Sequence, residues 1–142
     1  MIKAVLDTNV LASGFVAQSG STTTALLLDA WRVRQYLLVV SEPILTELAR
    51  TLQKPYFAAR LSQAQVVADL QLLRTDGLLT ALTIQVQGVA THAADDLVLA
   101  TAVSAQADYL VTGDHPLQQL GSHQGVTILS PIAFLQLLGL QP

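Results

Sequence analysis

Cysteine is absent from the 142 residues of this chain. The absence excludes disulfide bonds, zinc sites with thiolate ligands and cysteine nucleophiles. Charged residues are also scarce, at 12% of the chain, against the ~25% typical of a soluble domain. So little charge predicts that neutral polar side chains cover much of the surface, or that a partner covers apolar surface.

Long apolar runs are missing as well, since none approaches the ~18 residues of a membrane-spanning helix. The first ten residues, MIKAVLDTNV, carry an acid at Asp7 inside their apolar run, which is not the pattern of a signal peptide. We therefore expect a cytoplasmic protein without a membrane partner. A length of 142 residues predicts one domain, spanning residues 1–142.

A basic surface is not evident either, because the net charge is −3. This charge argues against a broad face for duplex nucleic acid. The charges are nevertheless unevenly distributed, with five of the seven basic residues lying between Arg32 and Arg60. The sequence also lacks a glycine-rich phosphate loop and an evident Ser-His-Asp arrangement.

What the sequence does contain is an alternation of short apolar segments with helical ones. The expected strands are residues 2–6, 36–40, 78–86, 109–112 and 126–129. The expected helices begin near Thr22, Ser41, Ser62, Asp95, Leu117 and Pro131. Such alternation predicts an α/β fold, a three-layer α/β/α sandwich around a mostly parallel sheet.

Acidic residues fall repeatedly at one predicted edge of this sheet. Asp7 and Asp114 follow the first and fourth strands, and Glu47 lies in the helix after the second strand. Asp95 and Asp96 open the helix that leads to the fourth strand. Ligands bind at the carboxyl ends of strands in open α/β sheets, so these acids are candidates for one site.

Each acid also has an ordinary structural explanation. Asp95 is placed to cap a helix, Glu47 can pair with Arg50 on a helix surface, and Asp114 suits a turn. Asp7 is harder to explain, because it directly follows buried residues and an ionised carboxylate is costly there.

A cluster of carboxylates repels itself and requires cations. Oxygen ligands without cysteine suit Mg²⁺ or Mn²⁺, which promote displacement at phosphorus. Asn9 and Thr112 are candidates to hold the carboxylates or a bound water. Arg50 lies three residues after Glu47, and Lys54 lies four residues after Arg50, so we expect them to share its helix face and to hold the phosphates of a substrate.

Several of these segments together resemble the PIN-domain ribonucleases, in particular the bacterial VapC-like toxins of toxin–antitoxin pairs. They are Asp7-Thr8-Asn9, the helix start from Ser41 to Glu47-Leu48, the pair Asp95-Asp96, the stretch ADYLVTGD ending at Asp114, and the tail from Ile128 to Leu135. The resemblance covers nearly the whole chain. His92 is a departure, since this branch often carries an acid there.

The resemblance implies a Mg²⁺- or Mn²⁺-dependent endoribonuclease that cleaves single-stranded RNA. It also implies a cognate antitoxin protein and a homodimer. It makes Asp7, Glu47, Asp114 and an acid of the Asp95-Asp96 pair the catalytic, metal-binding residues. The spacing of 114 − 96 = 18 residues matches the toxin pattern and favours Asp96 as the ligand, with Asp95 as cap or auxiliary acid.

Two alternatives compete with this reading. One is a catalytically weak PIN scaffold that acts by binding protein, which the retention of all four acidic positions disfavours. The other is a phosphatase on a similar sheet, and the absence of a second aspartate two residues after Asp7 disfavours it.

Overall fold

The computed structural model describes residues 1–90 and 93–141. The strands are β1 (Lys3–Leu6), β2 (Leu37–Val40), β3 (Leu78–Leu79), β4 (Tyr109–Val111), β5 (Ser122–His123) and β6 (Val126–Leu129). The helices are α1 (Thr8–Val16), α2 (Thr23–Arg32), α3 (Glu42–Thr51), α4 (Pro55–Ala58), α5 (Gln63–Asp76), α6 (Ala93–Ser104), α7 (His115–Gln119) and α8 (Pro131–Leu137).

The strands form one sheet in the order β3-β2-β1-β4-β6-β5. Every pairing is parallel except that of β5 with β6. The order reverses direction at β1, which lies between β2 and β4, so the switch point of the sheet falls at the end of β1. Asp7 is the residue immediately after that end.

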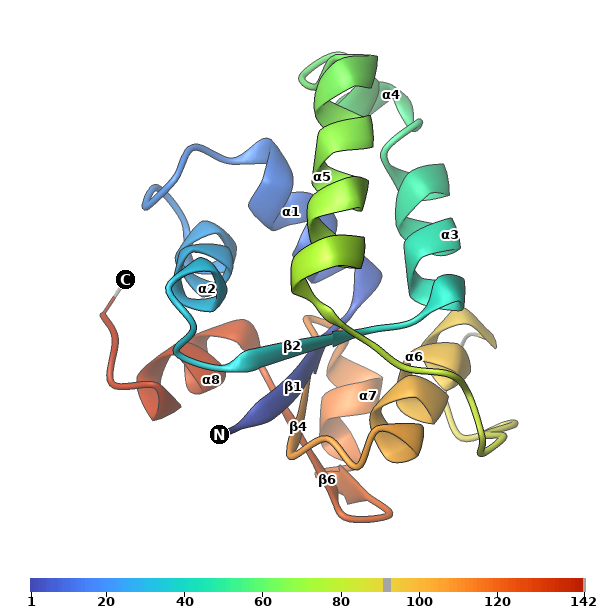
Figure 1. Ribbon diagram of the computed structural model, residues 1–142. Coiled ribbons are helices and arrows are strands. Elements are labelled where there is room, and N and C mark those ends of the chain that lie inside the picture. Colours follow the sequence, from blue (N-terminus) through green and yellow to red (C-terminus); the bar gives the residue numbers. More distant parts are fainter. Residues whose placement is uncertain (91–92, 142) are drawn as a thin grey trace.

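Helices cover both faces of this sheet, which confirms the predicted three-layer α/β/α sandwich. Helices α2 and α8 pack together on one side, and α6 and α7 lie on the other (Figure 1). The central strands are buried because both of their faces are covered; Val5, Leu38 and Leu110 are at most 1% exposed. Within the described residues, no helix is long and apolar enough to cross a bilayer.

Side chains that accept hydrogen bonds from backbone amides begin most of these helices. Thr22, Ser41, Ser62 and Ser130 cap α2, α3, α5 and α8 respectively. Ser41 also bonds through Oγ to Thr101 Oγ1 of α6, at 2.7 Å. This bond ties the start of α3 to α6, and both helices line the candidate site described below.

Helix α1 is an element that the sequence analysis missed. Its segment contains Gly14, and glycine commonly marks a loop. In the structure Gly14 is a close contact between helices, because a Cβ atom there would lie 2.6 Å from Leu28 Cδ1 and 3.0 Å from the Thr24 carbonyl oxygen. Packing on α2 thus offsets the low helix propensity of glycine.

Two other predicted elements end earlier than expected. The strand expected over residues 78–86 stops at Leu79, because β2 ends at Val40 and offers no further partner. The amides of Thr83 and Ile84 donate instead to Ser104 Oγ, at 3.0 and 3.2 Å.

The helix expected to begin near Ser41 and to include Lys54 ends at Thr51. Lys54 is extended, with φ −64° and ψ 149°, which is the backbone conformation that a following proline favours. The prediction that Lys54 shares a helix face with Glu47 is therefore wrong.

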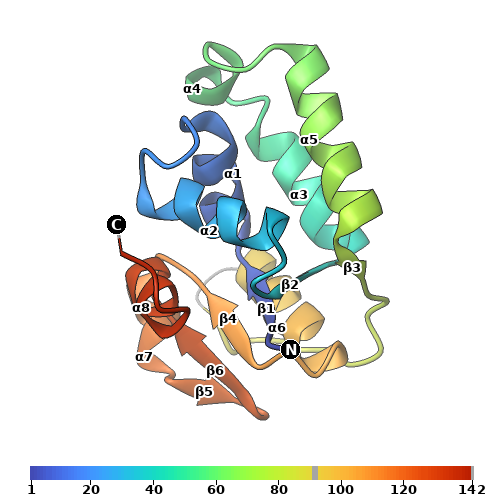
Figure 2. The ribbon, with the colours of Figure 1, turned by 60° about the vertical axis from the view of Figure 1, so that its left-hand side comes forward.

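Helices α3, α4 and α5 form an arm that projects beyond the sheet. Helix α4 lies at the tip, between the end of α3 and the start of α5 (Figures 1 and 2). An ion pair between Glu42 of α3 and Arg74 of α5 joins the other end of the arm. The exposed side of α3 therefore runs from the sheet edge toward this tip.

Candidate functional site

Asp7 stands at the switch point and is 5% exposed. It caps α1, because its Oδ1 accepts a hydrogen bond of 2.8 Å from the amide of Val10. Its Oδ2 accepts a short hydrogen bond from the hydroxyl of Thr112. Burial raises the pKa of the Asp7 carboxyl; these two hydrogen bonds oppose the shift, and the nearby charges of Asp95 and Asp114 add to it.

Thr112 connects Asp7 to Asp114. It is fully buried, and while its hydroxyl donates to Asp7, it accepts a 3.1 Å hydrogen bond from the amide of Asp114. Asp114 caps α7 by accepting from the amide of Leu117 at 2.9 Å. Gln118 donates from Nε2 to the Thr112 carbonyl, at 2.7 Å. Thr112 thus contacts the carboxylate of Asp7 and the backbone of Asp114.

Asp95 and Asp96 have different surroundings although they are adjacent on α6. Asp95 lies close enough to Asp7 for its charge to raise the pKa of that carboxyl. Asp96 points instead to the preceding loop, where its two oxygens accept three backbone amides: Gly88 at 2.9 Å, Val89 at 3.2 Å and Ala90 at 2.8 Å.

Spacing favoured Asp96 as the metal ligand; the choice stays a prediction, and the contacts of the two acids favour Asp95 instead. Asp95 approaches the acid cluster, and Asp96 anchors a loop. Asp95 is also not the cap of its helix, because α6 begins at Ala93 and both acids lie in its first turn. His92, where we noted a departure from the toxin pattern, lies outside the described residues.

Glu47 lies on α3 and accepts a 2.9 Å hydrogen bond from Arg50 Nη1. This is the helix-surface pair that was its ordinary explanation. The Arg50 side chain is 70% exposed, so its guanidinium remains accessible to solvent. Asn9 is exposed and, among the contacts of the described residues, its side chain makes no hydrogen bond, so it does not contact a carboxylate as Thr112 does.

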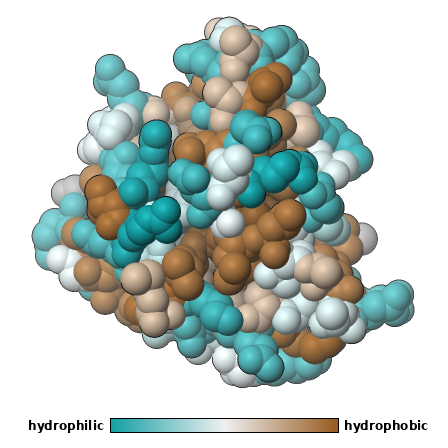
Figure 3. All heavy atoms as spheres, in the orientation of Figure 1, coloured by the Kyte–Doolittle hydropathy of each residue, from teal (hydrophilic) through white to brown (hydrophobic). Residues whose placement is uncertain are grey.

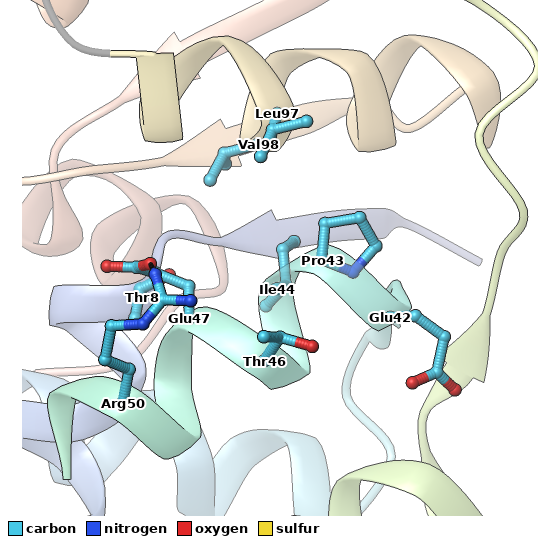
Figure 4. A pocket seen from close by; sticks show the side chains of 9 residues that line it. All are labelled: Thr8, Glu42, Pro43, Ile44, Thr46, Glu47, Arg50, Leu97 and Val98. Carbon is cyan, nitrogen blue, oxygen red and sulfur yellow. Dashed lines mark hydrogen bonds and ion pairs between the residues drawn. The ribbon is translucent and has the colours of Figure 1, made fainter. Parts of the chain in front are cut away.

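A cleft of about 360 Å³ opens between α3 and α6 beside these acids. Figure 4 shows Thr8, Glu47 and Arg50 at one end, with Leu97 and Val98 of α6 opposite α3, and Glu42 turned away at the other end. Sequence reasoning did not select Thr8, Leu97 or Val98. Their signal was positional, since each stands within two residues of a candidate acid.

Thr8 carries the one buried side-chain oxygen or nitrogen that lacks a hydrogen-bond partner in the described part of the chain. Thr8 as a whole is 8% exposed. A buried hydroxyl without a partner costs ~1–3 kcal/mol. The start of α1 therefore holds a local source of instability next to Asp7.

Replacing Thr8 by valine should raise the free energy of unfolding by about 1 kcal/mol, because valine keeps the shape and removes the unpartnered hydroxyl. Chemical denaturation of both proteins measures the change. Ser13→Ala is the control, since it removes a hydroxyl that is exposed and bonded to Thr24 at 3.1 Å. A Thr8→Val variant less stable than the wild type would show that the hydroxyl has a favourable partner, such as water.

The acids fit a particular kind of metal site. Among the described residues, no three histidine, aspartate or glutamate side chains stand close enough to hold an ion by themselves. Mg²⁺, however, commonly takes one or two carboxylates and completes its shell with water and substrate phosphate. Asp7 with Asp95 or Asp114 fits such an ion, because the donors are all oxygen and the charges of Asp95 and Asp114 act on the Asp7 carboxyl.

Comparisons with known proteins agree with the fold described above. The sequence profile of the PIN domain matches residues 3–116. The crystal structure of PAE2754 from Pyrobaculum aerophilum is similar, with a TM-score of 0.64 and 19% identity over 99% of this chain and 91% of that one. Mycobacterium tuberculosis VapC20, described as a sarcin-ricin loop cleaving toxin, has a TM-score of 0.58 and 13% identity over 85% and 97%. A comparison with curated proteins found no significant match.

Proposed function

Since the chain belongs to the PIN-domain family, whose members are generally nucleases, we propose that it is a metal-dependent endoribonuclease that cleaves single-stranded RNA. The observation that carries this proposal is the grouping of Asp7, Asp95 and Asp114 at the switch point of the sheet, where like charges act on a buried carboxylate. A protein keeps such a costly arrangement when cations or substrate use it.

The residues near the switch point have different proposed roles. Asp7, Asp95 and Asp114 would hold Mg²⁺ or Mn²⁺, and such an ion would supply activation of water and stabilisation of negative charge at phosphorus. Thr112 orients the carboxylate of Asp7 through its hydroxyl and fixes the backbone of Asp114 by accepting from its amide. Asp96 fixes the loop that precedes α6.

Glu47 and Arg50 serve the substrate side of the cleft. Arg50 can leave Glu47 for an RNA phosphate, because both side chains reach solvent and an exposed pair of this kind contributes only ~0.2–1 kcal/mol. Glu47 is then freed to approach a cation that Asp7 holds. Lys54 contributes a phosphate contact from the turn after α3 rather than from the helix itself.

The likeness to VapC20 supports a more specific biological role. We propose that the protein acts in the cytoplasm as the toxin of a toxin–antitoxin pair, binds a cognate antitoxin protein, and forms a homodimer. The low charge of 12% supports partner-covered apolar surface. Leu78 and Leu79, 41% and 46% exposed on the edge strand β3, are part of that surface.

A catalytically weak scaffold that acts by binding protein is the second candidate. What favours it is that no three-acid metal group stands assembled among the described residues and that Glu47 is paired with Arg50.

Labelled single-stranded RNA, incubated with the protein in Mn²⁺ or in EDTA, tests the proposal. We expect internal cleavage only with Mn²⁺, because the acid cluster requires a cation to bring a phosphate near it. A phosphomonoester in parallel should remain intact. If RNA stays intact in Mn²⁺ at high protein concentration, the ribonuclease proposal is rejected and the scaffold hypothesis remains. Hydrolysis of the phosphomonoester alone would identify a phosphatase.

A further inference from the structure

The tip of the arm carries positive charge that the net charge conceals. Between Leu48 and Ala68 the chain contains three basic residues, Arg50, Lys54 and Arg60, and no acid. The segment therefore has a net charge of +3, although the whole chain has a net charge of −3. It spans the last turn of α3, all of α4 and the start of α5, and hydrophilic side chains cover most of that end of the molecule (Figure 3).

An exposed aromatic side chain lies within this basic segment. Tyr56 of α4 is 56% exposed, whereas Tyr36 is fully buried in the core. The guanidinium carbon of Arg60 lies 3.8 Å from the centre of the Tyr56 ring. Arg60 Nη1 also donates to the Tyr56 carbonyl, at 2.7 Å.

Neighbouring residues of α4 hold the stacked pair of Tyr56 and Arg60 in position. Phe57 packs against the hydrophobic core and meets Tyr56 edge-on, with ring centres 5.1 Å apart and planes at 82°. Pro55 starts α4 and restricts its backbone. Tyr56 and Arg60 therefore present a flat aromatic and cationic surface whose orientation is already set before any ligand binds.

Positive charges connect this surface to the cleft. Arg50 lines the cleft, and Lys54 follows in the turn between Arg50 and α4. From Glu47 to the end of α3 the helix rises only ~6 Å. A strand bound at the acids thus reaches α4 within a few nucleotides.

We propose that Lys54, Tyr56 and Arg60 form a second RNA-binding surface, the α4 platform, on which a base stacks while the neighbouring phosphates contact the cations. This inference rests on the proposed ribonuclease function, since it takes RNA as the ligand. Planar rings beside cations are the surfaces on which unpaired bases stack, and they do so with little regard to sequence.

Fluorescence anisotropy in EDTA tests the platform separately from cleavage. The probe is a labelled oligoadenylate of about 12 nucleotides, within the range of site sizes for single strands. Tyr56→Ala should weaken binding by about 5- to 150-fold, the effect of losing one base–aromatic stack. Tyr56→Phe should bind as the wild type does, because the stacking ring remains.

Charge and base contributions need their own controls. Arg60→Gln should weaken binding, whereas Arg34→Gln should not, although both remove one exposed positive charge. An abasic oligonucleotide of the same length should bind wild type and Tyr56→Ala equally. Equal affinity of oligoadenylate for wild type and Tyr56→Ala, or equal losses with Arg60→Gln and Arg34→Gln, would overturn the platform.

The outcome also separates the platform from the proposed function. Oligoadenylate binding that depends on Tyr56, in a protein that cleaves no RNA with Mn²⁺, would retain the platform and reject the nuclease. If the protein cleaves RNA and the Tyr56→Ala variant binds oligoadenylate as tightly as the wild type does, the nuclease is retained and the platform is rejected. Tighter binding of an acidic polyglutamate peptide than of oligoadenylate would overturn the platform and identify a protein partner.

Discussion

Asp7→Asn is expected to lower RNA cleavage by at least ~100-fold, because loss of even an outer partner of a metal site costs ~10–100-fold. The same substitution is expected to raise the melting temperature of the metal-free protein. Asparagine retains an oxygen to accept from the Val10 amide, and its amide group can donate to Thr112. The Val10 contact is kept and the Thr112 contact reverses its direction, while one buried charge disappears.

The direction of this stability change depends on pH. Burial and the charges of Asp95 and Asp114 raise the pKa of Asp7 above its ordinary value of 3.8. A raised pKa means that the native state holds the proton more tightly than the unfolded chain does. The metal-free wild type is therefore destabilised as pH rises above 3.8 and through the folded pKa, so the gain from asparagine is present at pH 7 and disappears in acid.

Thermal melts at neutral and acidic pH, combined with cleavage assays, measure both effects. Asp108→Asn is the matched control, because Asp108 is exposed at the opposite edge of the sheet and accepts from the Lys3 amide at 2.9 Å. It should change neither cleavage nor the effect of metal. An Asp7→Asn variant that cleaves RNA at the wild-type rate would remove Asp7 from the site.

Mn²⁺ is expected to stabilise the wild type by ~2.7 kcal/mol at a hundredfold excess over its Kd. Asp95→Asn should abolish this stabilisation, because Asp95 is the acid of its pair that acts on Asp7. Asp96→Asn should preserve it, because the Asp96 oxygens face the loop amides.

Asp96→Asn carries a different cost. Asp96 accepts from the Gly88 amide through Oδ2 and from the Ala90 amide through Oδ1. Asparagine has only one accepting oxygen, so it cannot keep both of these hydrogen bonds. Hydrogen bonds to a charged group contribute ~1.5–3 kcal/mol, so a loss of that size in the free energy of unfolding is expected. Melts of both variants in Mn²⁺ and in EDTA decide the assignment. Metal stabilisation that survives in Asp95→Asn and vanishes in Asp96→Asn would restore the assignment drawn from spacing.

The sequence by itself determined the layers of the fold and the edge where the acids gather. Short apolar strands between helices can bury both faces only in a covered parallel sheet, and Asp7 and Asp114 directly follow two of those strands. The position of an acid along the chain is a local property. The pattern could therefore predict which residues reach the switch point.

Only the tertiary structure decided what each carboxylate does there. Spacing alone favoured Asp96 over Asp95, but it could not show that a loop folds back onto the oxygens of Asp96. Gly14 likewise suits a loop until Leu28 packs against it. The cleft itself joins Thr8, Glu47 and Leu97 from three separate helices. Contacts between distant segments depend on packing in three dimensions, which no local spacing in the chain records.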